Sequence, residues 1–197
     1  MTRSRVLEAA RELFIERGFA ATPINAIAKR AAVSPETIYA VFGSKRSLLA
    51  RLVDAAIAGS AEAPPILDQA WVEEMHREAE PRQRLRILAK HGSAILQRRA
   101  AIDEVVRGAA SADTHIAELW RKGRAERFAG QRELLRIALD GLGAAAGQAL
   151  DDRAAVLFAI GSPETYQALV VDRGWSSDRF ARWYADALEC LLLPDVT

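Results

Sequence analysis

The sequence predicts an all-α protein with about nine helices. Apolar residues recur three and four positions apart through almost every segment, which is the spacing of one helix face. No segment alternates apolar and polar residues with the β-branched enrichment of a strand. Ser or Thr directly before Pro is typical of a helix start, and it occurs at Thr22, Ser34 and Ser162.

The N-terminal quarter of the chain predicts four helices separated by tight turns. The first ends at Gly18, which can adopt the left-handed conformation that closes a helix. The second begins at Thr22 as its capping residue, and the third begins at Ser34. The fourth starts at Ser44 and runs to about Gly59.

The third helix, residues 34–42, is too short to be stable alone, so neighbouring helices must hold it. On a helical wheel, Ile38, Val41 and Phe42 share the inward side. The side chains that point away from this side or lie on its flanks are Glu36, Thr37, Tyr39 and Ala40.

The rest of the chain predicts mostly longer helices. Residues 66–80 are expected to be irregular with some helix, and Pro81 opens a long helix. The Gly-Ser-Pro triplet at 161–163 is expected to kink or restart its helix, with Ser162 as the cap. The other expected helices cover 102–110, 114–142, 151–174 and 176–193.

Charge and cysteine content narrow the function classes. Residues 1–50 hold eight Lys or Arg against four Asp or Glu, whereas residues 51–197 hold 19 against 22. A basic N-terminal segment is typical of nucleic-acid contact, although a solvated helical surface also scatters by a few charges. One cysteine excludes an internal disulfide, and three scattered histidines predict no metal and no cofactor.

We find no leader segment and no apolar run long enough to cross a membrane. The expectation is therefore a soluble, cytoplasmic protein without a membrane partner.

Short helices with tight turns are typical of a helix-turn-helix unit, whose second helix lies in the DNA major groove. Thr37 can donate to a phosphate or a base, Tyr39 can reach a phosphate oxygen, and Ala40 can touch a thymine methyl. Lys45 and Thr22 lie at helix N-termini, where backbone N–H groups favour a phosphate. Each signal alone is also an ordinary helix start, and Tyr39 could equally be a half-buried core residue.

The stretch "AARELFIERGFAATPINAIAKRAAVSPETIYAVFGSKRSLL" resembles the DNA-binding domain of the TetR family of bacterial transcriptional regulators. The matching features include a first helix that ends in Gly-aromatic and a Thr that opens the second helix. The family link "IA…AGVS" corresponds here to Ile27, Ala28 and "RAAVS". Tyr39, Phe42 and Lys45 then follow at the family's spacing.

The resemblance implies contacts of this third helix and its flanks with DNA. It places Thr37, Tyr39 and Lys45 on the DNA backbone. The expected base-facing positions are Pro35, Glu36 and Ala40. Together with the helix caps, the expected DNA-contacting set is Thr22, Ser34, Pro35, Glu36, Thr37, Tyr39, Ala40 and Lys45.

Two residues depart from the family pattern. Val41 stands where an aromatic residue is usual, and Glu36 stands where Gly or Lys is frequent. A carboxylate near phosphates lowers affinity unless it accepts from a cytosine amino group or pairs with Arg46 or Lys29.

The last two helices also resemble the family, in which they pair with their copies in a four-helix dimer interface. The apolar stripe with its aromatic residues exceeds what one chain need cover, although simple core packing remains an alternative. The expected interface residues are Tyr166, Leu169, Val170, Phe180, Trp183, Tyr184, Ala187, Leu188 and Leu191.

The middle of the chain corresponds to the part of the family that holds a small-molecule pocket. The expected domains are thus a helix-turn-helix domain, residues 1–47, and a helical ligand-binding and dimerisation domain, residues 48–197. The candidate lining residues, each of which could instead be core, are His91, Ile95, Trp120, Arg124, Phe128 and Phe158.

The resemblance implies a non-enzymatic, DNA-binding regulator. We expect a repressor that binds a palindromic, double-stranded operator as a homodimer and is released by a small-molecule inducer. The aromatic and arginine content favours a planar or anionic inducer. The alternatives are a DNA-binding regulator without a ligand and an all-helical enzyme or interaction protein. The last is disfavoured because no catalytic constellation or phosphate-binding loop is present in the sequence.

Overall fold

The computed structural model describes residues 2–142 and 145–193, and every regular element within them is helical. The chain divides into two compact units. The first unit consists of Met1–Ala63 and Ala101–Gly123, and the second of Pro64–Ala100 and Arg124–Thr197. This division differs from the expected boundary at 47/48, because the whole of the fourth helix and a later stretch of chain pack with the N-terminal helices.

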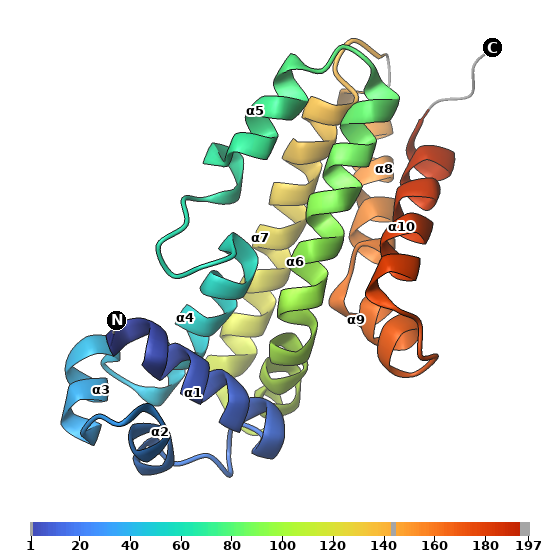
Figure 1. Ribbon diagram of the computed structural model, residues 1–197. Coiled ribbons are helices and arrows are strands. Elements are labelled where there is room, and N and C mark those ends of the chain that lie inside the picture. Colours follow the sequence, from blue (N-terminus) through green and yellow to red (C-terminus); the bar gives the residue numbers. More distant parts are fainter. Residues whose placement is uncertain (1, 143–144, 194–197) are drawn as a thin grey trace. The chain divides into compact units, whose positions relative to one another are not determined.

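The first unit begins with four helices, drawn in blue to cyan in Figure 1. They are α1 (Thr2–Arg17), α2 (Ile24–Ala31), α3 (Pro35–Phe42) and α4 (Lys45–Ala58). Their core includes Leu13, Phe14 and Ile38, and it is completed by Ile102 and Ile116 from later helices. The short helix α3 is therefore held by packing, as expected from its length.

The remaining helices follow α4 in the sequence. They are α5 (Ala70–Arg77), after a 3₁₀ turn η1 (Ile66–Asp68), then α6 (Pro81–Ala110), α7 (Thr114–Ala138), α8 (Gly147–Ile160), α9 (Pro163–Tyr166), a π-helical turn η2 (Gln167–Val171) and α10 (Ser177–Leu192). Of these helices, α6 and α7 contribute residues to both units, and the others belong to the second unit. The expected separate helix over 102–110 was wrong, because α6 continues through it without a break. The expected restart at Ser162 is confirmed, since its hydroxyl accepts from the Thr165 N–H at 3.0 Å.

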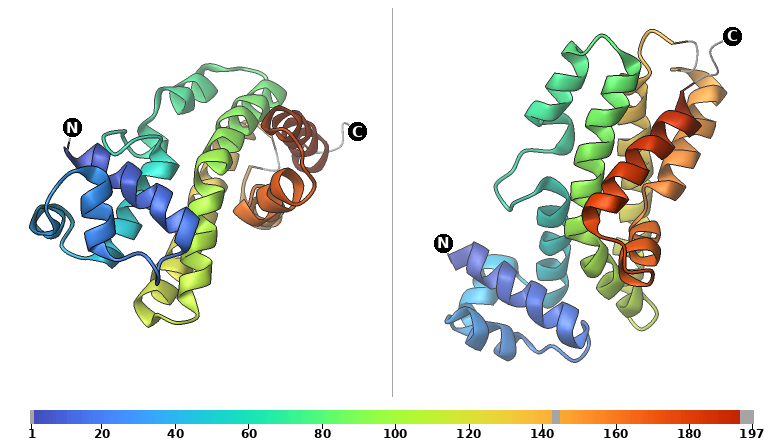
Figure 2. Two further views of the ribbon diagram at one scale, coloured as in Figure 1. Left: turned by 60° about the horizontal axis from the view of Figure 1, so that its bottom comes forward. Right: turned by 45° about the vertical axis from the view of Figure 1, so that its right-hand side comes forward.

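The core of the second unit lies among α5, α6, α7, α8 and α10. Helices α8 and α10 lie side by side (Figure 2). The Tyr184 ring of α10 reaches both Gly92 of α6 and Gly161 after α8, and a Cβ on Gly161 would lie 2.4 Å from the Tyr184 hydroxyl. Complete burial raises the pKa of that hydroxyl well above its usual range.

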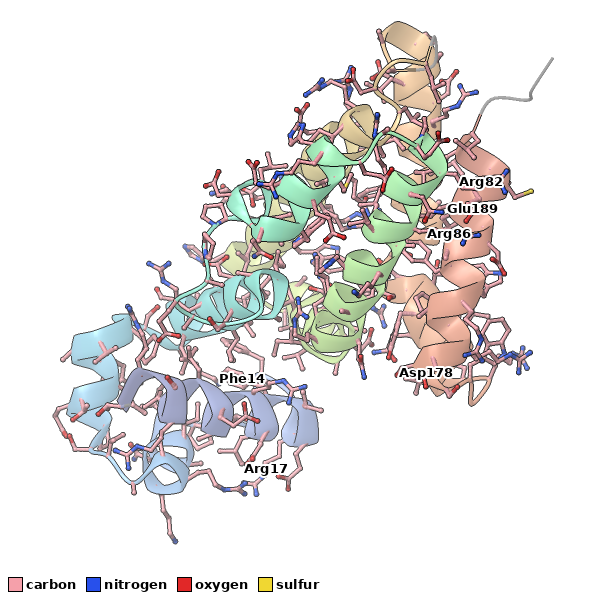
Figure 3. All side chains as sticks on the ribbon, turned by 45° about the horizontal axis from the view of Figure 1, so that its top comes forward. Phe14, Arg17, Arg82, Arg86, Asp178 and Glu189 are labelled. Carbon is pink, nitrogen blue, oxygen red and sulfur yellow. The ribbon has the colours of Figure 1, made fainter. Side chains whose placement is uncertain are left out.

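Charged side chains join helices at the edge of the second unit. Arg82 and Arg86 of α6 both pair with Glu189 of α10 (Figure 3), and the Arg82–Glu189 distance is 3.4 Å. Arg84, on another side of α6, donates to the Asp140 carbonyl at 2.9 Å and to the Ile137 carbonyl at 3.3 Å. The guanidinium of Arg84 thus donates to carbonyl groups at and just beyond the C-terminal end of α7, where intrahelical donors run out.

One helical stretch, Gly147–Val171, is long and apolar enough to cross a membrane by length and composition alone. This corrects the expectation that no such run exists. The stretch is interrupted at Ser162–Pro163, and it contributes Leu150, Leu157 and Tyr166 to the core of the second unit. A single stretch of this kind is weak evidence for a membrane span.

Candidate nucleic-acid interface

A tight turn sets the start of α3 relative to the end of α2. Ala32 closes α2 in the left-handed conformation, with φ of 52°, and it is the one non-glycine residue with positive φ in the described part of the chain. The Val33 N–H donates to the Ala28 carbonyl at 3.0 Å, which is the bond of a Schellman closure. The chain therefore reverses within three residues and enters α3 at Ser34.

The N-terminus of α3 is capped by its own sequence. The Ser34 hydroxyl accepts from the Thr37 N–H at 3.2 Å, and Pro35 occupies the first helical position. Ile38 and Phe42 are buried, with 1% and 7% of their surface exposed. These contacts fix which side of α3 faces outward.

The outward side of α3 is open to solvent in the first unit. Tyr39 is 52% exposed, which argues against the core alternative, and Glu36 and Ala40 are exposed as well. Thr37 and Pro35 are half-buried. The expectation that Val41 points inward was wrong, because its side chain is 39% exposed.

Glu36 is a carboxylate without a cation partner among the residues that the structure describes. Hydrogen bonds from its own backbone N–H and from the Ser34 hydroxyl lower the pKa of Glu36. The side chain is therefore negatively charged at neutral pH. Neither of the two possible cation partners, Arg46 and Lys29, pairs with Glu36 among the described residues. Arg46 binds Asp113 instead.

Lys45 begins α4 but does not extend freely into solvent. Its Nζ lies 4.2 Å from the centroid of the Phe19 ring, a cation–π contact within the first unit. Partial burial lowers the pKa of Lys45. The Ser44 hydroxyl caps the same helix end by accepting from the Ser47 N–H at 3.1 Å. Lys45 is thus held beside a helix N-terminus, where backbone N–H groups favour an anion.

Thr22 does not occupy the place expected from the sequence. Its side chain is fully buried, and its hydroxyl donates to the Leu13 and Gly18 carbonyls at 3.1 and 2.8 Å. The residue that precedes α2 as its cap is Pro23, with no side-chain hydrogen bond. The prediction that Thr22 caps α2 is therefore wrong, because its hydroxyl donates to carbonyl groups near the C-terminal end of α1 instead.

The candidate pocket residues are only partly brought together. Arg124, Phe128 and Phe158 meet in the second unit, where the two phenylalanine rings lie 5.7 Å apart and the Arg124 guanidinium lies 5.1 Å from the Phe158 ring. His91 stacks on Trp71 at 4.7 Å. Ile95 is half-buried on α6, and Trp120 packs against the core of the first unit.

Sequence reasoning missed Arg127 at this place. Its guanidinium lies 3.6 Å from the Phe158 ring and donates to the Phe158 carbonyl at 2.9 Å. We call Arg124, Arg127, Phe128 and Phe158 the Phe158 cluster. The spacing of Arg124, Arg127 and Phe128 along α7 was the available signal, because these positions share a helix face.

The residues expected at a dimer interface separate into two groups. Four of them lie inside the core of a single chain and are 6% exposed or less: Tyr166, Phe180, Tyr184 and Leu188. These four side chains are covered by their own chain, so the structure favours the core-packing alternative for them. The others are half-buried or exposed: Leu169, Val170, Trp183, Ala187 and Leu191.

Four packed helices with a Schellman turn before an exposed, capped α3 define a helix-turn-helix protein. Residues 6–52 match the family model described as bacterial regulatory proteins, tetR family. The HTH-type transcriptional regulator UidR of Escherichia coli (strain K12) is 46% identical over 52 residues, which are 26% of this chain and 26% of UidR. The match thus spans about a quarter of that relative's length.

Solved structures extend the likeness over the whole chain. A transcriptional regulator from Saccharomonospora viridis, solved in complex with choline, is 25% identical, with a TM-score of 0.66 and coverage of 95% of both chains. A TetR-family regulator from Syntrophomonas wolfei is 16% identical and shows the same fold, with a TM-score of 0.75 over 100% of this chain and 98% of that one. Residues 6–52 thus match the DNA-binding domain of the TetR family, and the rest of the chain shares its fold with solved regulators of that family.

Proposed function

We propose that this protein is a DNA-binding transcriptional regulator that inserts α3 into the major groove. The observation that carries the proposal is the exposed side of α3 with Glu36, Tyr39 and Ala40, in a domain whose residues 6–52 match the family model. Ile38 and Phe42 anchor the opposite side, so α3 presents a fixed surface to the groove. The Lys45 ammonium and the N-terminal turn of α4 then hold a backbone phosphate.

Titration of a DNA duplex from upstream of the protein's own gene, at two salt concentrations, tests this proposal. Phosphate contacts release counterions, so affinity is expected to fall by about a thousandfold between roughly 50 and 200 mM salt. Lys45→Ala is expected to weaken binding and to reduce the salt slope by about one. Tyr39→Phe is expected to weaken binding through loss of its phosphate hydrogen bond.

A matched charge control is Arg77→Ala, which removes one positive charge from α5 in the second unit. It is expected to leave DNA affinity and its salt slope unchanged. Melting temperatures of all variants show whether each remains folded. Wild-type protein that binds no upstream duplex, or binds with no dependence on salt, would contradict the proposal.

We further propose that the protein acts as a homodimer on a palindromic operator. The proposed interface is formed by the members of the expected set that one chain leaves partly or largely exposed: Leu169, Val170, Trp183, Ala187 and Leu191. Val156 on α8 and Val171 in η2 are further exposed apolar residues of the second unit. A two-fold dimer would place its α3 helices about 34–36 Å apart, one turn of DNA.

Sedimentation velocity tests the proposed interface. Leu191, which is 51% exposed, changed to Arg is expected to shift the protein toward monomer and to weaken operator binding. Leu67→Arg introduces the same change at a residue that is 44% exposed in η1, and it serves as the control. A wild-type monomer, or a dimer that Leu191→Arg leaves intact, would contradict this interface.

We also propose that a small molecule binds at the Phe158 cluster and weakens the binding of this protein to DNA. Guanidinium groups already face the Phe158 ring, so an anionic planar compound suits the cluster better than a cation. Arg124 donates to Glu164 at 3.1 Å, and an anionic ligand would compete with that carboxylate. The proposed consequence is that the protein, in the cytoplasm, leaves the operator and the repressed genes are expressed.

Competition on a fixed DNA complex tests the ligand class. A hundredfold loss of affinity requires about 2.7 kcal/mol of coupling between the two sites. Aromatic carboxylates are expected to release the DNA, choline is expected not to, and Arg124→Gln is expected to remove the response. If none of these compounds alters DNA affinity, the protein acts as a regulator without a ligand of this class.

A further inference from the structure

We propose that Glu36 reads a cytosine in each operator half-site by accepting a hydrogen bond from the cytosine N4 amino group. This inference rests on the proposed function, because it requires α3 to lie in the major groove. It adds the residue and the base that set one position of the operator sequence.

The position of Glu36 suits contact with a base edge. It is the second residue of α3, and residues near the N-terminus of a recognition helix reach the bases. Glu36 and Ala40 are four residues apart and therefore share one side of the helix. Both are exposed, whereas the side chain of Ile38 between them is 1% exposed on the inner side.

Electrostatics restrict what this carboxylate can contact. The nearest basic residue along the chain is Arg30, which is held by Glu12 at 2.5 Å. On the C-terminal side of α3, Arg46 is held by Asp113 at 2.8 Å. Among the described residues no cation neutralises Glu36, so it would enter a groove lined by phosphates as a full negative charge. Such a group lowers affinity for every sequence except one that supplies a donor to it.

Base chemistry selects cytosine as that donor. In the major groove guanine offers two acceptors and thymine offers one acceptor with a methyl group. Adenine places an acceptor next to its amino donor, which repels the second carboxylate oxygen. Cytosine offers an amino donor without an acceptor on its own edge, and Glu and Asp side chains pair with it for this reason.

The competing explanation is that Glu36 only stabilises the start of α3. Negative charge near a helix N-terminus is favourable, and the carboxylate accepts from its own backbone N–H and from Ser34. A purely structural role would alter the melting temperature of a variant but not the base preference. The two explanations are therefore separated by measuring sequence preference and stability on the same protein.

The experiment is selection of duplexes from a randomised library by the full-length protein, followed by sequencing of the bound fraction. Wild type is expected to enrich a palindrome with a C·G pair at one symmetric position of each half-site. Glu36→Gln, which keeps the shape of the side chain, is expected to lower the preference for C at that position by about tenfold to a hundredfold. A glutamine side chain favours adenine, so A is expected to rise there while the other positions stay unchanged.

Glu62→Gln is the matched control, since it removes the same charge beyond the C-terminal end of α4. The 14 residues of α4 span about 20 Å, and Glu62 follows the end of this helix that is remote from Lys45. Its selected sequences are expected to equal those of wild type.

The selection experiment tests the DNA-binding function and the cytosine contact separately. If wild type enriches no sequence, the proposed DNA-binding function is overturned. If wild type enriches a palindrome and Glu36→Gln selects the same palindrome with the same base frequencies, the cytosine inference is overturned and the DNA-binding function stands.

Discussion

Arg46 at the start of α4 donates to the Asp113 carboxylate at 2.8 Å, across 67 residues of sequence. Asp113 also accepts from the backbone N–H groups of His115 and Ile116, at 3.1 and 3.3 Å, and so caps α7. One carboxylate therefore joins the N-terminal turns of α4 and α7 within the first unit. Because α4 follows α3 directly, this contact helps to fix the helix that we place on DNA.

Asp113→Asn is expected to destabilise the protein at neutral pH. The Arg46 hydrogen bond lowers the pKa of Asp113 below its ordinary value of 3.8 in the folded state. A carboxylate with a lowered folded-state pKa contributes stability above its unfolded-state pKa, and this contribution is lost as the pH falls through the folded-state value. Urea unfolding from pH 7 to pH 3 should show the gap between variant and wild type closing below about pH 4. Asp68→Asn in η1 is the control, and a gap independent of pH would contradict the account.

Thr22→Val is expected to reduce stability by about 1–3 kcal/mol, because it removes a buried hydroxyl that donates to the Leu13 and Gly18 carbonyls. Thr22→Ser retains the hydroxyl and is expected to lose less. Urea unfolding measures both changes. If Thr22→Val kept wild-type stability but lost DNA affinity, Thr22 would act at the DNA after all.

Ala32→Gly is expected to stabilise the protein by about 0.5–1 kcal/mol. Relief of a left-handed alanine contributes roughly 1–2 kcal/mol, and the greater freedom of glycine in the unfolded chain offsets part of it. Ala31→Gly, one residue earlier inside α2, is expected to destabilise. Chemical denaturation of the two variants should give opposite signs, and equal signs would contradict the assigned backbone conformation.

Gly161→Ala is expected to destabilise the second unit. Its new Cβ would lie 2.4 Å from the Tyr184 hydroxyl and 2.8 Å from the Leu157 carbonyl, so the backbone must shift. Gly108→Ala, inside α6 with nothing within 4 Å, is the matched control and is expected to stabilise by about 0.5–1 kcal/mol. Thermal melts of both variants test the packing, and a Gly161→Ala protein as stable as wild type would refute it.

Local signals predicted the helix-turn-helix well. The serine caps at Ser34, Ser44 and Ser162 each bond a residue three positions later, so the sequence alone can predict them. The all-α fold and the TetR resemblance are confirmed. Thr22 misled because Thr-Pro is a start signal, while its hydroxyl is used by the preceding helix.

Contacts between distant residues were beyond sequence reasoning. The sequence did not indicate that Arg46 pairs with Asp113 and not with Glu36, because Arg46 and Asp113 are 67 residues apart. The stripe on α10 predicted an apolar face correctly, but periodicity cannot say whether its own chain or a second copy covers that face. The core takes Phe180, Tyr184 and Leu188, which leaves Trp183, Ala187 and Leu191 at its flank.

The central claim is that the exposed side of α3 contacts DNA, and Ala40→Glu tests it most directly. Ala40 is exposed, so the change is expected to leave stability intact while placing a second carboxylate among the phosphates. Ala129→Glu makes the same change at an exposed residue of α7 in the second unit. In anisotropy titrations at fixed salt, we expect at least about a hundredfold weaker DNA binding for Ala40→Glu and wild-type affinity for Ala129→Glu. Equal affinities for Ala40→Glu and wild type would contradict the account.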